Sequence, residues 1–149
     1  MPRNDLLKGR VSLPGQIYHI TICTDQRRPW FESLEYSRLV IGQMRKMHDE
    51  KMLHSMAWVL MPDHLHWLLQ LTENNELSAV IKRFKGSAAR ALNKKLGRSG
   101  AIWQRGFYDH ALRREDDIRQ TARYIVANPL RAGIVDSIGA YPHWDAIWL

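Results

Sequence analysis

The 149-residue chain contains a single cysteine, Cys23, and this scarcity excludes several kinds of site. One cysteine cannot close an intramolecular disulfide, and it cannot supply a cysteine-rich zinc centre. No uncharged apolar run approaches the roughly 18 residues that a membrane-spanning helix needs. Residues 1–10 alternate charged and apolar side chains and lack the apolar segment of a signal peptide. We therefore expect a cytoplasmic protein in a reducing compartment, without a membrane partner.

Several catalytic signatures are missing from the sequence as well. The phosphate-binding pattern GxxxxGK[ST] is absent, and so is the nucleophile pattern GxSxG. The acidic residues are scattered along the chain and do not form the pairs that a two-metal nuclease requires. These absences argue against a P-loop nucleotidase, an α/β-hydrolase and a two-metal nuclease.

Acidic residues are outnumbered by basic ones. There are 15 Asp and Glu against 22 Lys and Arg, which gives a formal charge of +7. Hydrophobic residues make up 45% and charged residues 25%, as in ordinary globular proteins. The length fits one domain over residues 1–149, with residues 1–14 as a loose N-terminal arm and residues 136–149 as a C-terminal tail. A basic domain of this size indicates a polyanionic partner, of which nucleic acid is the first candidate.

Hydrophobic periodicity predicts an alternating series of strands and helices. Strands are expected over residues 17–24, 56–61, 65–71 and 107–112, and helices over residues 34–50, 77–96 and 115–128. Ser33 is a candidate N-cap, Gly97 a helix terminator, and Pro129 disfavours a helical Asn128. This order is typical of an α+β, ferredoxin-like split βαβ fold, an antiparallel sheet with helices packed on one face. A further helix then follows at the C-terminal end.

His64 and His66 flank Leu65 in one of these strands. Alternate residues of a strand point to the same face, so both imidazoles would share an open face while Leu65 enters the core. Two such imidazoles can hold one divalent metal ion or one phosphate. The alternative is a pair of histidines on a polar sheet surface. His19 shows no partner pattern, whereas His110 could approach the pair.

Tyr124 and Asn128 are four residues apart and would lie one turn apart on one helix face. A phenol can act as a covalent nucleophile, and an amide oxygen can complete a metal site with two neutral imidazoles. Oxygen ligands and a phosphate substrate favour Mg²⁺ or Mn²⁺. The alternatives are a tyrosine that packs at the edge of the core and an asparagine that serves as a turn residue.

A set of basic side chains could bind a nucleic-acid backbone. Four of them share the polar face of the second predicted helix, and three lie in predicted loops: Lys82, Arg83, Lys85 and Arg90 in the helix, and Arg27, Arg28 and Arg105 in the loops. The alternative for the helix face is a solvated surface.

Two segments resemble a known family. Residues 58–69, WVLMPDHLHWLL, are similar to the His-hydrophobic-His signature of single-tyrosine transposases and endonucleases. Residues 102–135, with WQxxF followed by an acidic helix and YIxxNPxxAG, resemble the REP-associated tyrosine transposases in particular. Asp63 occupies a position where many relatives carry Asn or Glu, and we assign it to the turn between two strands.

The resemblance implies a function as well as the same ferredoxin-like fold. It implies that His64 and His66 bind the metal, that Asn128 is the third ligand, and that Tyr124 is the catalytic tyrosine. Members of the family cleave single-stranded DNA beside REP hairpins, the palindromes of bacterial chromosomes. The tyrosine forms a 5′-phosphotyrosine link, and the reverse reaction rejoins strands. A nucleoid-associated bacterial enzyme is therefore expected.

Two alternative functions remain at this point. The first is a hairpin-binding module of the same fold that does not cleave. The second is an RNA-binding domain, which would expose aromatic side chains on the central strands, where Trp58 and Trp67 lie. A monomer is favoured, with a dimer as the other option.

Overall fold

The computed structural model of the chain describes residues 15–72 and 75–147. The N-terminal arm expected over residues 1–14 lies outside the described residues. The main elements, in chain order, are β1 (Ile17–Cys23), α2 (Leu34–Asp49), β2 (Leu53–Met61), β3 (His64–Leu71), α3 (Leu77–Leu96), β4 (Tyr108–Leu112), α4 (Glu115–Val126), α5 (Asn128–Arg131) and β5 (Trp144–Ala146). Short 3-10 turns occur at η1 (Asp25–Arg27), η2 (Trp30–Glu32) and η3 (Ile138–Ala140).

The described strands form one five-stranded antiparallel sheet in the order β4-β1-β3-β2-β5. The first four strands have the order of the ferredoxin-like split βαβ fold, in which β3 lies between β1 and β2. The fold class expected from the order of elements is therefore confirmed. β1 and β3 are central neighbours, so side chains from these two strands meet on each face of the sheet.

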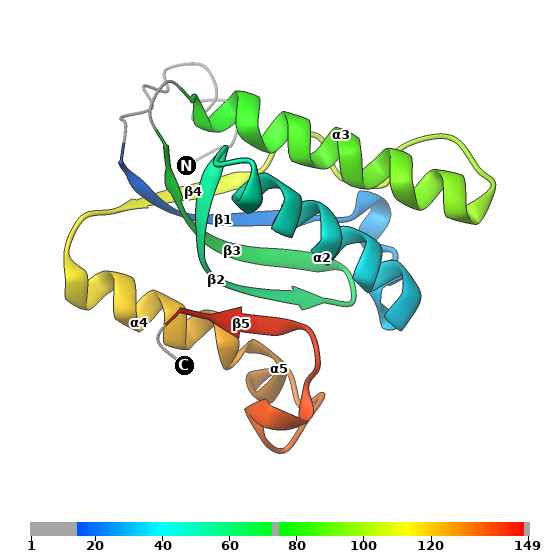
Figure 1. Cartoon of the computed structure of the whole chain (residues 1–149). Helices are drawn as coiled ribbons and strands as arrows, with labels where there is room; N and C mark the ends of the chain where they lie inside the picture. The colour runs from blue at the N-terminus through cyan, green and yellow to red at the C-terminus, as the bar shows by residue number, and fades with distance from the viewer. Residues whose placement is uncertain (1–14, 73–74, 148–149) are drawn as a thin grey trace.

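Helices cover both faces of the sheet (Figure 1). α2 and α3 pack on one face, over a core that includes Ile20, Leu65 and Trp67. α4 packs on the opposite face, where its Ile118, Ala122 and Ile125 join side chains of β2 and β3 in a second core. Alternation along the strands supplies apolar residues to both layers. The face under α4 is the one that carries His64 and His66.

The helix boundaries follow local signals in most places. The Ser33 hydroxyl accepts a hydrogen bond from the Tyr36 amide at 3.2 Å and caps α2, as predicted. α3 ends at Gly97, whose φ of +65° is the left-handed conformation that glycine adopts most readily. The expectation of a helix over residues 115–128 needs a correction. α4 ends at Val126, and Asn128 begins the separate helix α5, in which Pro129 occupies an early position that needs no amide hydrogen.

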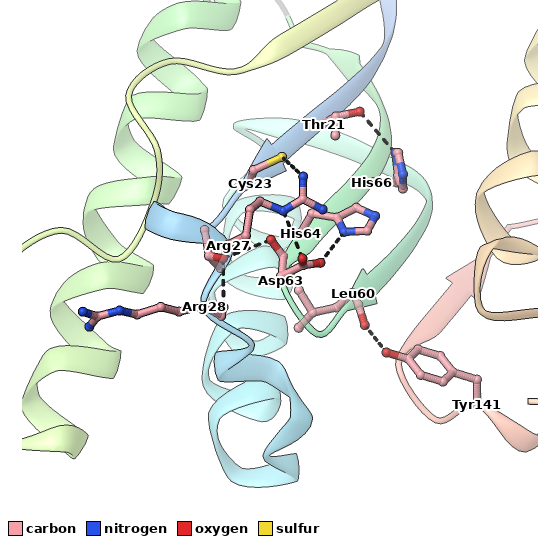
Figure 2. Close-up of polar contacts among 10 residues, drawn as sticks. Thr21, Cys23, Arg27, Arg28, Leu60, Asp63, His64, His66 and Tyr141 are labelled. Carbon is pink, nitrogen blue, oxygen red and sulfur yellow. Dashed lines mark hydrogen bonds and ion pairs between the residues drawn. The ribbon is translucent and has the colours of Figure 1, made fainter. Parts of the chain in front are cut away.

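The C-terminal segment, which sequence periodicity left unassigned, extends the sheet. β5 pairs with β2 through Ala57, Trp58 and Val59. The buried Tyr141 hydroxyl donates a 2.6 Å hydrogen bond to the Leu60 carbonyl, which fixes the segment before β5 to the same strand (Figure 2). No helix in the described part of the chain is long and apolar enough to cross a membrane.

Candidate active site

The two histidines of β3 share one face of the sheet, as strand alternation predicts. Their ring centres are 4.9 Å apart, and the rings stand almost perpendicular to each other. Leu65, between them, is fully buried on the other face. Across the strand pair, Thr21 of β1 lies opposite His66, and Cys23 lies opposite His64. Antiparallel partners project to the same side, so β1 adds its own polar side chains to this face.

Tyr124 of α4 lies beside this cluster. The centre of its ring is 6.3 Å from that of His66 and 6.5 Å from that of His19. Tyr124 is 52% exposed, whereas the apolar stripe of α4 turns towards the sheet. The structure therefore brings together the tyrosine and the histidine pair that the sequence analysis singled out separately. Arg131 of α5 adds a positive charge here, with its guanidinium carbon 3.8 Å from the centre of the Tyr124 ring.

Each histidine of the pair has a hydrogen-bonding partner at Nδ1. His64 Nδ1 lies 2.8 Å from Asp63 Oδ1, and Asp63 Oδ2 accepts a 3.0 Å hydrogen bond from Arg27 Nε (Figure 2). His66 Nδ1 lies 3.1 Å from Thr21 Oγ1 and 3.0 Å from His19 Nε2. Asp63 does lie in the turn between β2 and β3, but its side chain also contacts the site, which its assignment as a turn residue did not anticipate.

Burial and charge hold two of the imidazoles in their neutral form. Burial lowers the pKa of His66 to about 3, assisted by the charges of His64, His19 and Arg131. Burial also lowers the pKa of His19 to about 4, with His110 contributing. For Asp63, burial raises the pKa, but the hydrogen bonds from Arg27 and His64 outweigh it and keep the pKa below its ordinary value. The neutral form of an imidazole is the one that can bind a metal ion.

Two nitrogen atoms at this site are of a kind that can bind a divalent metal ion. His64 and His66 each have Nδ1 engaged, which leaves Nε2 of each ring as the nitrogen available to a metal ion. Within residues 15–72 and 75–147, His, Cys, Asp and Glu side chains form no group of three that could hold a metal. A third protein ligand among these residues would be of another type. Asn128, half-buried at the start of α5, remains the prediction for that role.

The predicted nucleic-acid-binding residues belong to α3 and to the loops. Lys82, Arg83, Lys85 and Arg90 belong to α3, which covers the face of the sheet opposite to His64 and His66. Lys85 donates 2.7 Å hydrogen bonds to the carbonyls of Gln104 and Gly106, and Arg83 forms an ion pair with Glu50. In the loops, Arg27 contacts Asp63, Arg28 lies against the Trp30 ring, and Arg105 is exposed. Nucleic-acid binding by these residues stays a prediction, but Lys85 clearly has a structural role.

Sequence reasoning missed His19, Thr21, Asp63 and Arg131 as members of the cluster. His19 and Thr21 are two residues apart in a strand, the same spacing as His64 and His66. That spacing was visible in the sequence, but it becomes meaningful only once β1 is known to pair with β3. His110, named above only as a possible neighbour, lies directly opposite His19 across β1 and β4 and therefore does approach the site.

Comparison with known proteins places this geometry in a family. The family described as "Transposase IS200 like" matches residues 12–128. A REP-associated tyrosine transposase of Escherichia coli is 26% identical over 134 residues, which cover 89% of this chain and 78% of that protein. A Haemophilus influenzae protein named as a REP-associated tyrosine transposase is 29% identical over 143 residues, with 87% and 78% covered.

A solved structure has the same fold. It is that of a REP-associated tyrosine transposase bound to a REP hairpin, and it superposes with a TM-score of 0.75 at 24% identity. The match covers 91% of this chain and 79% of that one. On the family match over residues 12–128, together with these relatives, the chain belongs to the IS200-like transposase family.

Proposed function

We propose that the protein is a metal-dependent endonuclease and strand transferase that acts on single-stranded DNA at REP-type hairpins, with Tyr124 as its nucleophile. The observation that carries this proposal is the position of Tyr124, which lies exposed beside His66 on the sheet face that also holds His64. The relatives named as REP-associated tyrosine transposases support the choice of substrate.

In the proposed reaction, the Tyr124 hydroxyl oxygen attacks the scissile phosphorus. The new bond joins that oxygen to the 5′ phosphate, and the bond between phosphorus and the 3′ oxygen breaks. The tyrosine proton is lost, and the departing 3′ oxygen gains a proton to become a hydroxyl. Attack by a 3′ hydroxyl on the phosphotyrosine reverses these changes and joins strands.

His64, His66 and Asn128 would hold Mg²⁺ or Mn²⁺, which would act as a Lewis acid on the scissile phosphate. The chain itself contributes the orientation of Tyr124 and a positive charge from Arg131 next to its ring. That charge would stabilise the negative charge that develops on the phosphate during attack.

The RNA-binding alternative fits the sheet poorly. It requires exposed aromatic rings on the central strands, but Trp67 is fully buried under α2 and α3, and Trp58 is half-buried and packs against the same core. The site face of β1 and β3 carries imidazoles and a hydroxyl instead. The other alternative, a hairpin-binding module that does not cleave, is distinguished from the proposed enzyme by the following experiment.

A covalent-capture assay tests the proposal. Labelled single-stranded hairpins with their flanking sequences are incubated with the protein and Mn²⁺, and a denaturing gel shows whether label migrates with protein. We expect an adduct that disappears with a chelator and in Tyr124→Phe. Tyr108→Phe is the matched control, because Tyr108 is also exposed and lies opposite Thr21. An adduct that persists in Tyr124→Phe contradicts the proposed nucleophile, and tight hairpin binding without any adduct favours the non-cleaving module.

A further inference from the structure

The contacts of His64 determine which of its two ring nitrogens carries the proton. A carboxylate has no hydrogen to donate, so the 2.8 Å contact between Asp63 Oδ1 and His64 Nδ1 requires the hydrogen to reside on Nδ1. A neutral imidazole has only one N–H. In its neutral form, His64 therefore keeps its free lone pair on Nε2, the nitrogen that faces away from Asp63.

Asp63 is held in place from two sides. Its Oδ2 accepts the 3.0 Å hydrogen bond from Arg27 Nε. Its backbone carbonyl accepts from the amide and the hydroxyl of the fully buried Thr24, at 3.0 and 3.1 Å. The turn between β2 and β3 is thereby tied to the end of β1, and the carboxylate has little freedom to rotate away from His64.

The loop that delivers Arg27 has an unfavourable backbone conformation. Gln26 and Arg27 both have positive φ angles, 56° and 54°. Residues other than glycine rarely adopt this backbone conformation. Such conformations persist where the surrounding contacts compensate for them, and they are concentrated at functional sites. The ion pair between Arg27 and Asp63 is a contact of that kind.

His66 provides an internal comparison. Its Nδ1 faces the Thr21 hydroxyl and His19 Nε2, and each of these groups can either donate or accept a hydrogen bond. The partners of His66 therefore permit both tautomers, whereas the partner of His64 permits one.

From these contacts we infer that Asp63 is a positioning residue that locks His64 in the Nδ1–H tautomer with Nε2 ready for the metal ion, and that Arg27 holds Asp63 in place for this task. The inference deepens the proposed function, since it rests on His64 being a metal ligand. It also changes the expected role of Arg27, which is assigned here to the carboxylate and not to DNA.

The tautomer can be measured in the full-length, metal-free protein. Long-range ¹H–¹⁵N correlation spectra at neutral pH distinguish Nδ1–H from Nε2–H imidazoles, and His64→Gln assigns the signal. We expect His64 as Nδ1–H in the wild type and a shift towards Nε2–H in Asp63→Ala. Asp63→Asn serves as the second variant in case Asp63→Ala folds poorly. It keeps the shape of the side chain but has one acceptor oxygen for the two donors, His64 and Arg27, so a partial shift of the tautomer is expected. A wild-type His64 in the Nε2–H form, or an unchanged tautomer in both variants, overturns the inference.

Metal affinity gives a second readout that does not depend on cleavage. Titration of Mn²⁺ followed by electron paramagnetic resonance should show roughly 10- to 100-fold weaker binding in Asp63→Ala, as is usual when a partner of a metal-binding histidine is removed. Arg27→Met should have a smaller effect in the same direction. Asp25→Ala is the control for charge, since it removes a carboxylate from the same loop, and it should bind Mn²⁺ like the wild type. An equal loss in Asp25→Ala and Asp63→Ala overturns the inference in favour of a general charge effect.

The two proposals fail in different ways. If His64 has the expected tautomer and Asp63→Ala weakens Mn²⁺ binding, the inference stands even when covalent capture yields no adduct, and only the proposed cleavage is contradicted. If the covalent adduct forms but His64 is not the Nδ1–H tautomer, the proposed cleavage is supported and the proposed role of Asp63 is contradicted.

Discussion

The guanidinium carbon of Arg131 lies 3.8 Å from the centre of the Tyr124 ring, and this contact joins α5 to α4 at the proposed nucleophile. The chain leaves α4 at Ala127 and resumes as the separate short helix α5, in which Pro129 occupies an early position that needs no amide hydrogen. The sequence predicts one helix over residues 115–128, whereas α4 ends at Val126, α5 starts at Asn128, and Arg131 of α5 lies over the ring.

Arg131→Met should slow the formation of the covalent adduct while hairpin binding changes little. A cation above an exposed aromatic ring contributes about 0.5–1 kcal/mol. If the whole of that contribution serves to orient the ring, its loss slows the reaction about two- to fivefold. Single-turnover kinetics at saturating hairpin would measure the change. An unaltered rate would show that the contact does not orient Tyr124.

Lys85→Met should destabilise the protein and leave the salt dependence of DNA binding unchanged. The ammonium group of Lys85 donates hydrogen bonds to the carbonyls of Gln104 and Gly106. Residues 102–104 are themselves joined to the end of β1 by backbone hydrogen bonds that the Gln104 and Asp25 amides donate. Loss of the donor leaves both carbonyls without this partner, at a cost of about 1–3 kcal/mol.

Urea unfolding would measure the loss of stability in Lys85→Met. Lys82→Met is the matched comparison, because Lys82 is exposed on the same helix. If the α3 surface binds a phosphate backbone, Lys82→Met flattens the salt dependence of DNA binding. A flatter slope in Lys85→Met than in Lys82→Met would reverse the roles assigned to the two lysines.

Tyr141 should make the protein lose stability at alkaline pH. Burial raises the pKa of Tyr141 to about 12 from its ordinary value of 10.0. Between these two values the folded state binds more protons than the unfolded state, so the free energy of unfolding decreases as pH rises above 10. The full effect of a shift of this size is about 2–3 kcal/mol. Chemical denaturation at several pH values should show a shallower alkaline decline in Tyr141→Phe, and parallel curves for the two proteins would contradict the assignment.

His143 should contribute to a loss of stability in acid. Burial lowers the pKa of this imidazole, and the charge of Arg38 lowers it further. As pH falls below the ordinary value of 6.5, the unfolded state takes up the proton first, so the free energy of unfolding decreases. His143→Gln should reduce the slope of this decline without abolishing it, because His19 and His66 have lowered pKa values as well. Thermal unfolding between pH 4 and 8, compared with the wild type, would test this.

The sequence alone determined those features that depend on local periodicity and local capping. Alternation in a strand places His64 and His66 on the same face whatever that strand pairs with, because successive side chains point to opposite sides. Ser33 and Gly97 mark helix ends through hydrogen bonds and dihedral angles within a few residues. The order of strands and helices was sufficient for the ferredoxin-like fold class, since few topologies accommodate it.

The tertiary structure decided which distant groups meet. Pairing of β1 with β3 brings Thr21 and His19 to His66, and no pattern within β1 specifies that partner or its register. Packing of α4 on the face opposite to α2 and α3 brings Tyr124 to the histidines, whereas α3 lies on the other face. The C-terminal residues become a strand only because the edge of β2 is available to pair with them. Local sequence sets the direction of each side chain along its own element, but the free energy that selects partners comes from burial and pairing across the whole sheet.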